Sequence, residues 1–392
     1  MKRVLGLDIG RGSAVGCILD QRPKRLKEYL QNNKRQFKQY SATAKDMQKL
    51  LAEDFDIAVL EPTGSHYARI WSNKLEAAGR EVLWVSHEAI ANHRKSYRLP
   101  NKSDPADALA LADYGLEHLG DREFFLATPF NELRDLYLQL QSLNSNRHPA
   151  ITRLRQQLTH EWPEVQKYKG DRPWTKANPP TLWRFIAGEE AGISRYQQKL
   201  EDSIGTGLSD FSRMLAGQIC SLERHECAIE KEISALLQQE VYRPYIRALT
   251  RLEFGPRLQA IALSHIYPIE KFLRPDGRVR NDHVRTQSGK RSRRNRSLAA
   301  FKMSLGMGMT LYQSGDKTGW RPGGPKYVRS ELWRWAKTAV VMRSPKKQAT
   351  IELRRRYDIE REAGIKSPIR VSRICWRGTE MAFKLILEEK AR

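Results

Sequence analysis

The hydrophobic pattern of this chain changes near residue 130, and that change limits the folds open to it. Up to about residue 120, short apolar runs of strand type alternate with stretches of helical periodicity. The runs predict strands at residues 4–9, 14–19, 36–40, 57–60 and 81–86, and the helical stretches predict helices at 45–51, 65–78 and 104–116. Such alternation indicates an α/β domain with a mixed sheet, which we place at residues 1–125.

Beyond residue 130, leucine and isoleucine recur every three or four residues in two long stretches. These stretches flank an irregular segment rich in Pro, Trp and Lys at 162–183. The pattern predicts an antiparallel hairpin or a dimerising coiled coil over residues 126–244, and a pair of amphipathic helices on a core is the alternative. Trp162, Trp174 and Trp183 in the irregular segment either stack on bases or close a small core.

The last part of the chain, residues 245–392, is expected to be a mainly helical third domain. Phe254-Gly255-Pro256 stands between two helical segments. This arrangement is typical of a helix-hairpin-helix-like element, in which a compact turn and a helix N-terminus contact a nucleic-acid backbone.

The chain is strongly basic, and the charge is concentrated towards its end. The net charge is +24, and residues 271–392 hold 31 Lys and Arg against 11 Asp and Glu, a net +20. Such a surplus indicates a polyanionic partner, nucleic acid before a membrane surface. The densest stretch, 278–296, predicts a loop that contacts phosphates, with a solvated tail as the alternative. Its candidate nucleic-acid-binding residues are Arg278, Arg280, Arg285, Lys290, Arg291, Arg293, Arg294 and Arg296.

The cysteines and the apolar runs argue against secretion and against structural zinc. The four cysteines are far apart and form no Cys-x-x-Cys pair, so a reducing cytoplasm is expected. Cys220, His225 and Cys227 are the residue types that bind zinc. However, the two cysteines are seven residues apart on one helix face, too distant to share an ion without further ligands, so we expect them to pack in a core or a coiled coil. No run of 18 apolar residues occurs, and Asp8 interrupts the first apolar run. We therefore expect no signal peptide and no membrane partner.

Four carboxylates are placed where strands end and a helix begins. Asp8 ends the first predicted strand, Glu61 follows a later one, and Asp104 and Asp107 share one side of a helix start. If the strands are neighbours, the four converge into a set of hard oxygen ligands that suits Mg²⁺ or Mn²⁺ and phosphoryl transfer. Taken singly, each acid is commonly a turn former or a helix cap. Asp8-Ile9-Gly10 also resembles the first phosphate loop of actin-like ATPases, but the sequence offers no second such loop.

These strings carry a resemblance to a known family. Leu7-Asp8-Ile9-Gly10, Leu60-Glu61-Pro62-Thr63-Gly64 and Lys102-Ser103-Asp104-Pro105-Ala106-Asp107-Ala108 resemble the RNase H-like, RuvC-type DEDD domain of the transposases of the insertion sequence 110 family, which are similar to the pilin-gene invertase. Phe254-Gly255-Pro256 resembles the family's Gly-x-Gly-Pro turn, with Glu253 as a departure. Residues 312–319 resemble its serine motif, so the resemblance extends over nearly the whole chain.

The resemblance implies an RNA-guided DNA recombinase. In this family a serine, here Ser314, becomes joined to a DNA 5′-phosphate, while the DEDD carboxylates bind divalent metal. The implied catalytic residues are Asp8, Glu61, Asp104, Asp107 and Ser314, with Mg²⁺ (or Mn²⁺) on the four acids. The implied partners are a structured non-coding bridge RNA, donor and target DNA, and further copies of the chain in a homo-oligomer, dimer or tetramer, whose composite sites pair the RuvC-like domain of one subunit with the serine domain of another. A nucleoid-associated cytoplasmic location follows.

Other residues and readings complete the sequence-based picture. The string Gln-Ser-Gly occurs twice, once around Ser314 and once around Ser288 in the basic stretch. Because the basic stretch resembles an insertion relative to the family, Ser314 is the preferred nucleophile. Further candidates for nucleic-acid contact are Lys317, Arg321, Arg329, Arg354, Arg355 and Arg356. The alternatives are a structure-selective endonuclease of the RuvC type, which uses the carboxylates and water alone, and an RNA-binding regulator without chemistry.

Overall fold

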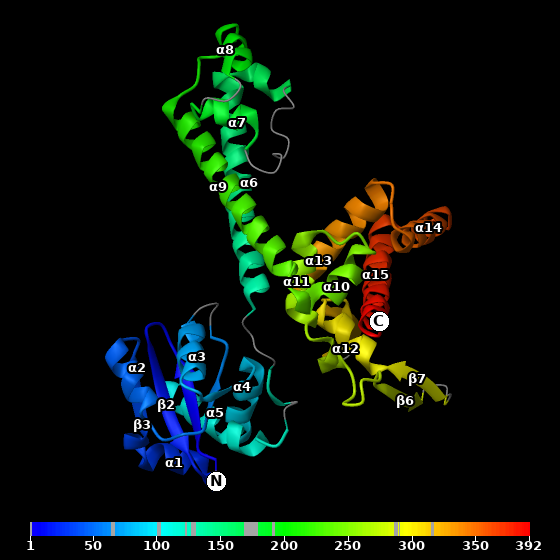
Figure 1. Cartoon of the computed structure of the whole chain (residues 1–392). Coiled ribbons are helices and arrows are strands. Elements are labelled where there is room, and N and C mark those ends of the chain that lie inside the picture. Colours follow the sequence, from blue (N-terminus) through cyan, green and yellow to red (C-terminus); the bar gives the residue numbers. More distant parts are fainter. Residues whose placement is uncertain are drawn as a thin grey trace. The chain divides into compact units, whose positions relative to one another are not determined.

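The computed structural model divides into two compact units, Met1–Asn131 and Glu132–Arg392, each of which is described here by itself (Figure 1). The structure describes all residues except 1, 64–66, 100–102, 122–123, 127–130, 168–178, 190–192, 286–288, 290 and 315–316. At residues 193–195, 284–285, 314 and 317 it describes the backbone alone. None of the described helices is both long and apolar enough to cross a membrane.

The first unit contains a five-stranded mixed sheet with the strand order β3-β2-β1-β4-β5. The strands are β1 (Val4–Ile9), β2 (Ser13–Leu19), β3 (Phe37–Ser41), β4 (Ile57–Leu60) and β5 (Glu81–Trp84). β2 pairs antiparallel with both β1 and β3, whereas β1, β4 and β5 run parallel to one another. The mixed sheet confirms the α/β prediction and is consistent with an RNase H-like domain.

Helices cover this sheet, and two of them are absent from the sequence-based prediction. The helices of the first unit are α1 (Leu26–Asn32), α2 (Ala44–Leu51), α3 (Tyr67–Ala77), α4 (His87–Ser96) and α5 (Asp104–His118), with a 3-10 turn η1 at Lys34–Gln36. α1 and α4 were missed because they bury few side chains, Leu26 in α1 and Ile90 and His93 in α4, and so carry little periodic signal.

The second unit begins with a long helical hairpin (Figure 1). α6 (Glu132–Glu161) and α9 (Asp210–Leu237) pack along each other, and η3 (Pro163–Lys167), α7 (Thr181–Ile186) and α8 (Ile193–Glu201) lie between them in sequence. Leu140 of α6 shares a core with Ile233 of α9, and Leu158 shares another with Leu215, so the two helices are antiparallel. Of the two predicted arrangements, an antiparallel hairpin and a dimerising coiled coil, the chain therefore forms the antiparallel hairpin.

The aromatic and sulfur side chains of this hairpin are core residues. Trp162 and Trp183 are buried and join a core with Phe185 and Tyr196, which favours the packing interpretation over base stacking. Trp174 lies outside the described residues. All four cysteines are free and buried, including Cys220 and Cys227 on α9, as expected for packing.

A helical core follows the hairpin in the second unit, and it includes the expected pair of helices. α10 (Arg243–Thr250) and α11 (Pro256–Ile266) are joined by a five-residue turn. In that turn Glu253 has φ 54°, a left-handed conformation that favours glycine, at the position where the family pattern has glycine. Its carboxylate accepts bonds from the Lys346 amide (3.1 Å) and the Thr350 hydroxyl. The remaining helical elements are η4 (Glu240–Tyr242), η5 (Ile269–Phe272), α12 (Arg296–Ser304), α13 (Lys326–Trp335), the π-helix η6 (Ala336–Met342), α14 (Gln348–Glu362) and α15 (Ser367–Lys390).

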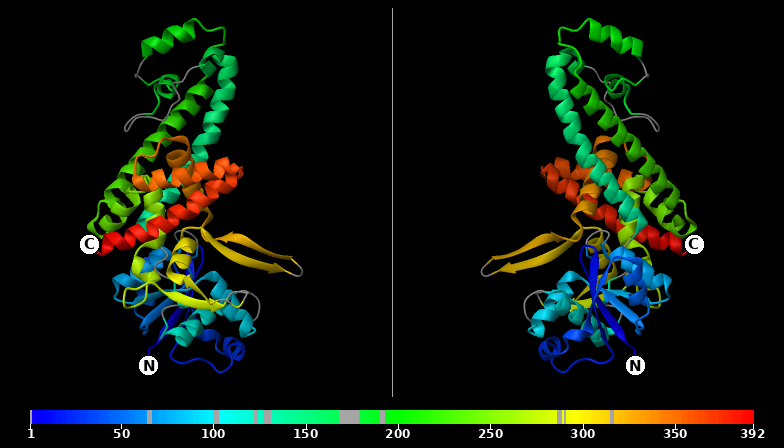
Figure 2. Two further views of the ribbon diagram at one scale, coloured as in Figure 1. Left: turned by 90° about the vertical axis from the view of Figure 1, so that its right-hand side faces the viewer. Right: turned by 90° about the vertical axis from the view of Figure 1, so that its left-hand side faces the viewer.

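Two β-hairpins project from these helices, and both correct the sequence-based expectation (Figure 2). The basic stretch 278–296, predicted as a loop, contains the antiparallel pair β6 (Asn281–Arg285) and β7 (Arg291–Asn295). The serine motif, for which no strand was predicted, lies in the antiparallel pair β8 (Gly308–Ser314) and β9 (Lys317–Gly323). Strand periodicity was not visible in β7, because its exposed residues Arg-Ser-Arg-Arg-Asn are polar on both faces and only the backbone ladder defines the strand.

Candidate functional site

Two of the predicted carboxylates leave the sheet at adjacent positions. Leu7 of β1 is paired with Leu60 of β4 on the neighbouring parallel strand. Asp8 directly follows Leu7 in the first strand, and Glu61 directly follows Leu60 in the second. Both acids are partly buried. Because the carboxyl ends of parallel neighbours meet at one edge and the strands lie about 4.8 Å apart, these two acids share that edge of the sheet.

α5 brings the other two carboxylates to the same edge. A Cβ on Gly6 of β1 would lie 2.1 Å from the Ala108 carbonyl oxygen, and one on Gly115 would lie 2.9 Å from the Val4 side chain, so the helix rests directly on the strand. Since Ala108 lies over Gly6 and Gly115 over Val4, α5 runs antiparallel to β1. Its first turn, which contains Asp104 and Asp107, is therefore at the end of β1 that carries Asp8.

α4 supplies basic partners to this edge. His87 Nδ1 lies 2.6 Å from Glu61 Oε2, and Arg94 Nε lies 2.7 Å from Asp107 Oδ1. Asp104 is exposed and Asp107 is buried. His87 and Arg94 were missed by sequence reasoning because α4 itself was missed; their spacing of seven residues, two helical turns, is the signal that places them on one helix face.

The donor set suits a hard divalent cation, although the side chains are not gathered around a point. Four carboxylates on one edge offer the oxygen ligands that Mg²⁺ and Mn²⁺ prefer. His87 and Arg94 now hold two of these carboxylates. Among the residues that the structure describes, the four acids do not form a group with three ligand atoms within 4.8 Å of one another. An ion would compete with the two bases for Glu61 and Asp107.

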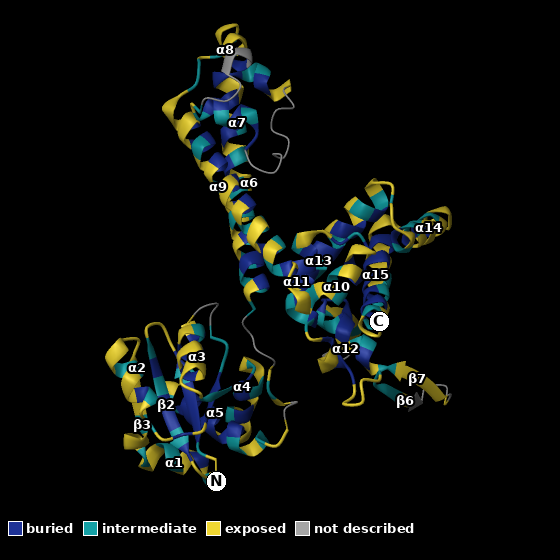
Figure 3. Cartoon of the chain, viewed as in Figure 1, coloured by how far each residue is buried: buried dark blue, intermediate teal, exposed yellow. Residues whose placement is uncertain are grey.

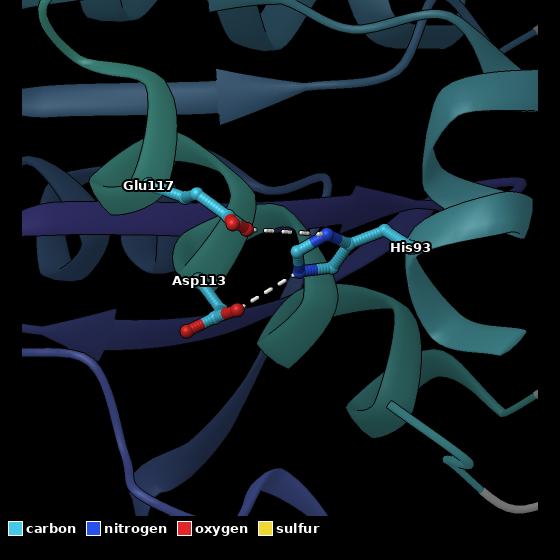
Figure 4. A group of neighbouring side chains, drawn as sticks. All are labelled: His93, Asp113 and Glu117. Carbon is cyan, nitrogen blue, oxygen red and sulfur yellow. Dashed lines mark hydrogen bonds and ion pairs between the residues drawn. The ribbon is translucent and has the colours of Figure 1, made fainter. Parts of the chain in front are cut away.

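A different group in the same unit does bring its ligand atoms together (Figure 4). In the described part of the chain, His93, Asp113 and Glu117 form the group whose ligand atoms all lie within 4.8 Å. His93 Nε2 is 2.8 Å from Asp113 Oδ2, and Nδ1 is 3.7 Å from Glu117 Oε2. It is an acidic cluster that sequence reasoning missed, because no motif connects α4 with the middle of α5.

Arg22 already neutralises this cluster. Its Nε and Nη2 donate to the two oxygens of Asp113, each at 3.0 Å, and Nη2 also donates to Glu117 at 2.9 Å. Burial alone would raise the pKa of Asp113, but the hydrogen bonds from His93 and Arg22 outweigh it and lower that pKa below its usual value. The cluster therefore acts as a clamp that ties the segment after β2 and α4 to α5.

The predicted nucleophile lies at the far end of the β8–β9 hairpin. Ser314 is the last residue of β8 and is paired with Lys317, the first residue of β9. The Arg321 guanidinium lies over the Tyr312 ring at 4.4 Å. On the other face of the hairpin, Leu311 and Trp320 are paired, and Trp320 is 65% exposed. The hairpin therefore presents a cation and an aromatic ring on one face and apolar side chains on the other.

Glycines hold the base of this hairpin. A Cβ on Gly308 or Gly323 would lie 2.7 Å from the Met303 sulfur, and one on Gly324 would lie 1.9 Å from the Met303 carbonyl oxygen. The base of the hairpin therefore lies directly against Met303 of α12. Arg329, another predicted phosphate contact, lies partly buried at the same base on α13.

The remaining basic candidates differ in how free their side chains are. Arg278, Arg291, Arg293, Arg294, Arg296, Arg355 and Arg356 are exposed, whereas Arg280 and Arg354 are partly buried. Arg280 donates to the Leu273 carbonyl at 3.0 Å, and Arg354 donates to the Val341 carbonyl at 2.6 Å and to Asp358 at 2.9 Å. Both therefore support the fold. The side chains of Arg285, Lys290 and Lys317, and the whole of Ser288, lie outside the described residues.

Comparison with known proteins agrees with the fold and with the acidic edge. The model of the DEDD transposase family of insertion sequence 110, described as a transposase, matches residues 5–163. This range contains the sheet except for Val4, the whole of α6 and all four predicted carboxylates. No curated protein matches the chain. The matched residues 5–163 therefore form a DEDD transposase domain of the insertion sequence 110 family, and this family indicates a divalent metal and DNA as the substrate.

Proposed function

We propose that this transposase is an RNA-guided recombinase that cuts and rejoins donor and target DNA strands through a covalent 5′-phosphoserine intermediate. The observation that carries the proposal is the placement of Asp8, Glu61, Asp104 and Asp107 at one edge of the sheet inside the family-matched domain. The serine hairpin of the second unit, on which Arg321 is exposed, supports it.

The carboxylates would hold the metal. Asp8, Glu61, Asp104 and Asp107 supply only oxygen ligands, so Mg²⁺ is the expected ion and Mn²⁺ a substitute. When bound, a divalent ion neutralises charge that develops on the phosphate oxygens in strand transfer. Arg94 and His87 position Asp107 and Glu61 through the contacts described above.

Ser314 is the proposed nucleophile. Its hydroxyl oxygen attacks the phosphorus of the scissile phosphodiester, the bond from phosphorus to the 3′ oxygen breaks, and the serine proton ends on the released 3′ hydroxyl. The product is a phosphoserine linkage to the 5′ end. Attack by the 3′ hydroxyl of another strand then reverses the step, releases the serine and joins the two DNA strands. Arg321, seven positions along the chain, would neutralise the phosphate as charge develops.

Nucleic-acid binding falls to the basic surface of the second unit. The exposed Arg355 and Arg356 of α14 are the expected contacts to backbone phosphates, and the exposed arginines of the β6–β7 hairpin are further contacts to nucleic acid. The guide would be a structured non-coding bridge RNA, because base pairing can then specify both DNAs while the protein holds backbones. A homo-oligomer, dimer or tetramer, would bring two DNA duplexes together, in a cytoplasmic, nucleoid-associated complex.

A covalent-adduct assay tests the nucleophile. The full chain is incubated with the RNA that copurifies with it, with Mg²⁺ and with DNA that is labelled on either the 5′ side or the 3′ side of the cleavage position. Denaturing gels then detect DNA that is covalently linked to the protein. The wild type and Ser288→Ala should give the adduct, and Ser314→Ala should not. Metal-dependent cleavage of branched DNA that survives Ser314→Ala and is lost with Asp8→Asn would instead favour the structure-selective endonuclease.

A further inference from the structure

The basic stretch is an ordered ribbon and not a loop. β6 and β7 pair antiparallel from Asn281 with Asn295 to Arg285 with Arg291, and residues 286–288 and 290 between them lie outside the described residues. Each strand has five residues, which at about 3.4 Å per residue gives a ribbon roughly 17 Å long. Figure 3 shows β7 as mainly exposed and the described part of β6 as mainly intermediate.

The two faces of this ribbon differ in charge. His283 is paired with Arg293, and Arg291 lies two residues from Arg293 on the same strand, so these three side chains share one face. All three are exposed, and no described acid lies on that face. On the opposite face Asp282 is paired with Arg294 and accepts from Arg296 at 2.9 Å. We call the face of His283, Arg291 and Arg293 the arginine face.

The base of the ribbon is anchored to the core of the second unit. The Arg280 amide donates to the buried Ser297 hydroxyl at 2.8 Å, and Ser297 donates in turn to the Phe272 carbonyl. The Asn295 side chain caps α12 by accepting from the Leu298 amide at 2.9 Å. A ribbon that continues directly into a capped helix holds its arginines in a defined direction, unlike a solvated tail.

We propose that the β6–β7 ribbon is a duplex-DNA-binding arm that enters the major groove with the arginine face towards the bases. The B-DNA major groove is about 12 Å wide and admits a two-stranded ribbon, whereas the major groove of A-form RNA is deep and narrow. Strands about 4.8 Å apart with side chains on two faces fit the former. Arginines that point at base edges donate in pairs to guanine O6 and N7. This inference rests on the proposed function for its DNA partner and names the element that holds it.

The test uses the full chain with a 30-base-pair DNA duplex, an RNA duplex of the same sequence and a single strand, all measured by fluorescence anisotropy. Arg291→Ala/Arg293→Ala should weaken DNA duplex binding by about tenfold or more and abolish protection of guanine N7 from dimethyl sulfate. Arg291→Lys/Arg293→Lys keeps the charge and loses the paired donors, so it should restore part of the affinity and little of the N7 protection.

Two controls separate the arm from general electrostatics. Arg153→Ala/Arg213→Ala removes two exposed charges from α6 and α9 and should leave the N7 footprint intact. Ser292→Ala on the opposite face of the ribbon should behave like the wild type. Far-UV circular dichroism establishes that each variant is folded.

The possible results are distinct. Unchanged N7 protection in Arg291→Ala/Arg293→Ala would overturn the proposal, and so would an equal loss of affinity for duplex RNA, which would make the ribbon an RNA arm. Asp8→Asn should keep the footprint and lose strand cleavage. If Asp8→Asn still cleaved DNA, the proposed function would fail, while the footprint would still report on the arm.

Discussion

Arg94 Nε lies 2.7 Å from Asp107 Oδ1, and the side chains are 18% and 8% exposed. The pair joins α4 to the first turn of α5 at the edge where Asp8 and Glu61 end their strands. A carboxylate this far from water needs a positive partner, and the guanidinium provides it in this structure. The acidic edge is therefore balanced by a helix that the sequence pattern did not reveal.

Replacement of Arg94 should make the first unit depend on a divalent cation. Arg94→Gln leaves Asp107 buried without its partner, so we expect the free energy of unfolding to fall by about 3 kcal/mol in a metal-free buffer. Mg²⁺ should then raise the Tm of this variant more than that of the wild type, because the ion takes the place of the guanidinium. Differential scanning calorimetry with and without 10-fold EDTA excess measures this. Equal Mg²⁺ shifts in both proteins would show that Asp107 does not hold the ion.

The contact between β1 and α5 should not tolerate a methyl group. A Cβ on Gly6 would lie 2.1 Å from the Ala108 carbonyl oxygen and 2.4 Å from the Ala112 amide nitrogen, both backbone atoms. Gly6→Ala should therefore destabilise the protein by more than about 3 kcal/mol or leave it unfolded. Gly120→Ala is the matched control, because nothing lies within 4 Å of its Cβ. Urea denaturation of both variants decides, and comparable midpoints would contradict the packing.

The strained turn between α10 and α11 predicts an order of stability among variants of one residue. Glu253→Ala keeps a side chain at φ 54° and loses the bonds from Lys346 and Thr350. Glu253→Gly loses the same bonds and relieves the left-handed conformation. The glycine variant should therefore be more stable than the alanine variant by about 1 kcal/mol in chemical denaturation. An alanine variant as stable as the glycine variant would argue against strain at this position.

Glu223 should make the helical hairpin sensitive to pH. Burial raises the pKa of this carboxyl to about 7, while Arg147 at 3.6 Å and the neighbouring Glu226 act in opposite directions. Because the folded pKa is above the ordinary value near 4.5, the group favours the folded state below pH 4.5, and this contribution is lost as the pH rises through 7.

Wild-type stability should therefore fall by about 2 kcal/mol between pH 5 and pH 8 through this group. Glu223→Gln, which cannot ionise, should lack that part of the pH dependence and should be the more stable protein at pH 8. Thermal melts across the pH range measure the difference. Glu232→Gln, on the same helix but exposed, is the control that should follow the wild type. A parallel pH profile for wild type and Glu223→Gln would refute the assignment.

Much of the first unit was predictable from local pattern. Buried runs such as Val4–Ile9 and Ile57–Leu60 are apolar at every or nearly every position, and the ends of these runs placed Asp8 and Glu61 at strand ends. α5 was predictable for the same reason, because its segment Ala106–Gly115 is buried throughout and is rich in alanine and leucine. Helices with one buried face and little apolar content, such as α4, could not be predicted from hydrophobic pattern.

The strands of the basic region could not be predicted from local pattern. Arg291–Asn295 is polar on both faces, and its strand exists because the backbone of Asn281–Arg285 pairs with it, a relation between positions that no local periodicity reveals.

The sequence by itself therefore determined the mixed sheet, the helical remainder, the concentration of positive charge towards the end of the chain and the family to which the strings belong. Only the tertiary structure decided which residues face the carboxylates and what form the basic stretch takes. The pairing of Leu7 with Leu60 and the close approach of Gly6 to Ala108 bring the four acids to one edge, and α4 then adds His87 and Arg94. These are contacts between segments far apart in the chain, and they depend on packing and on backbone hydrogen bonds, whereas sequence pattern records mainly which side of each segment is buried.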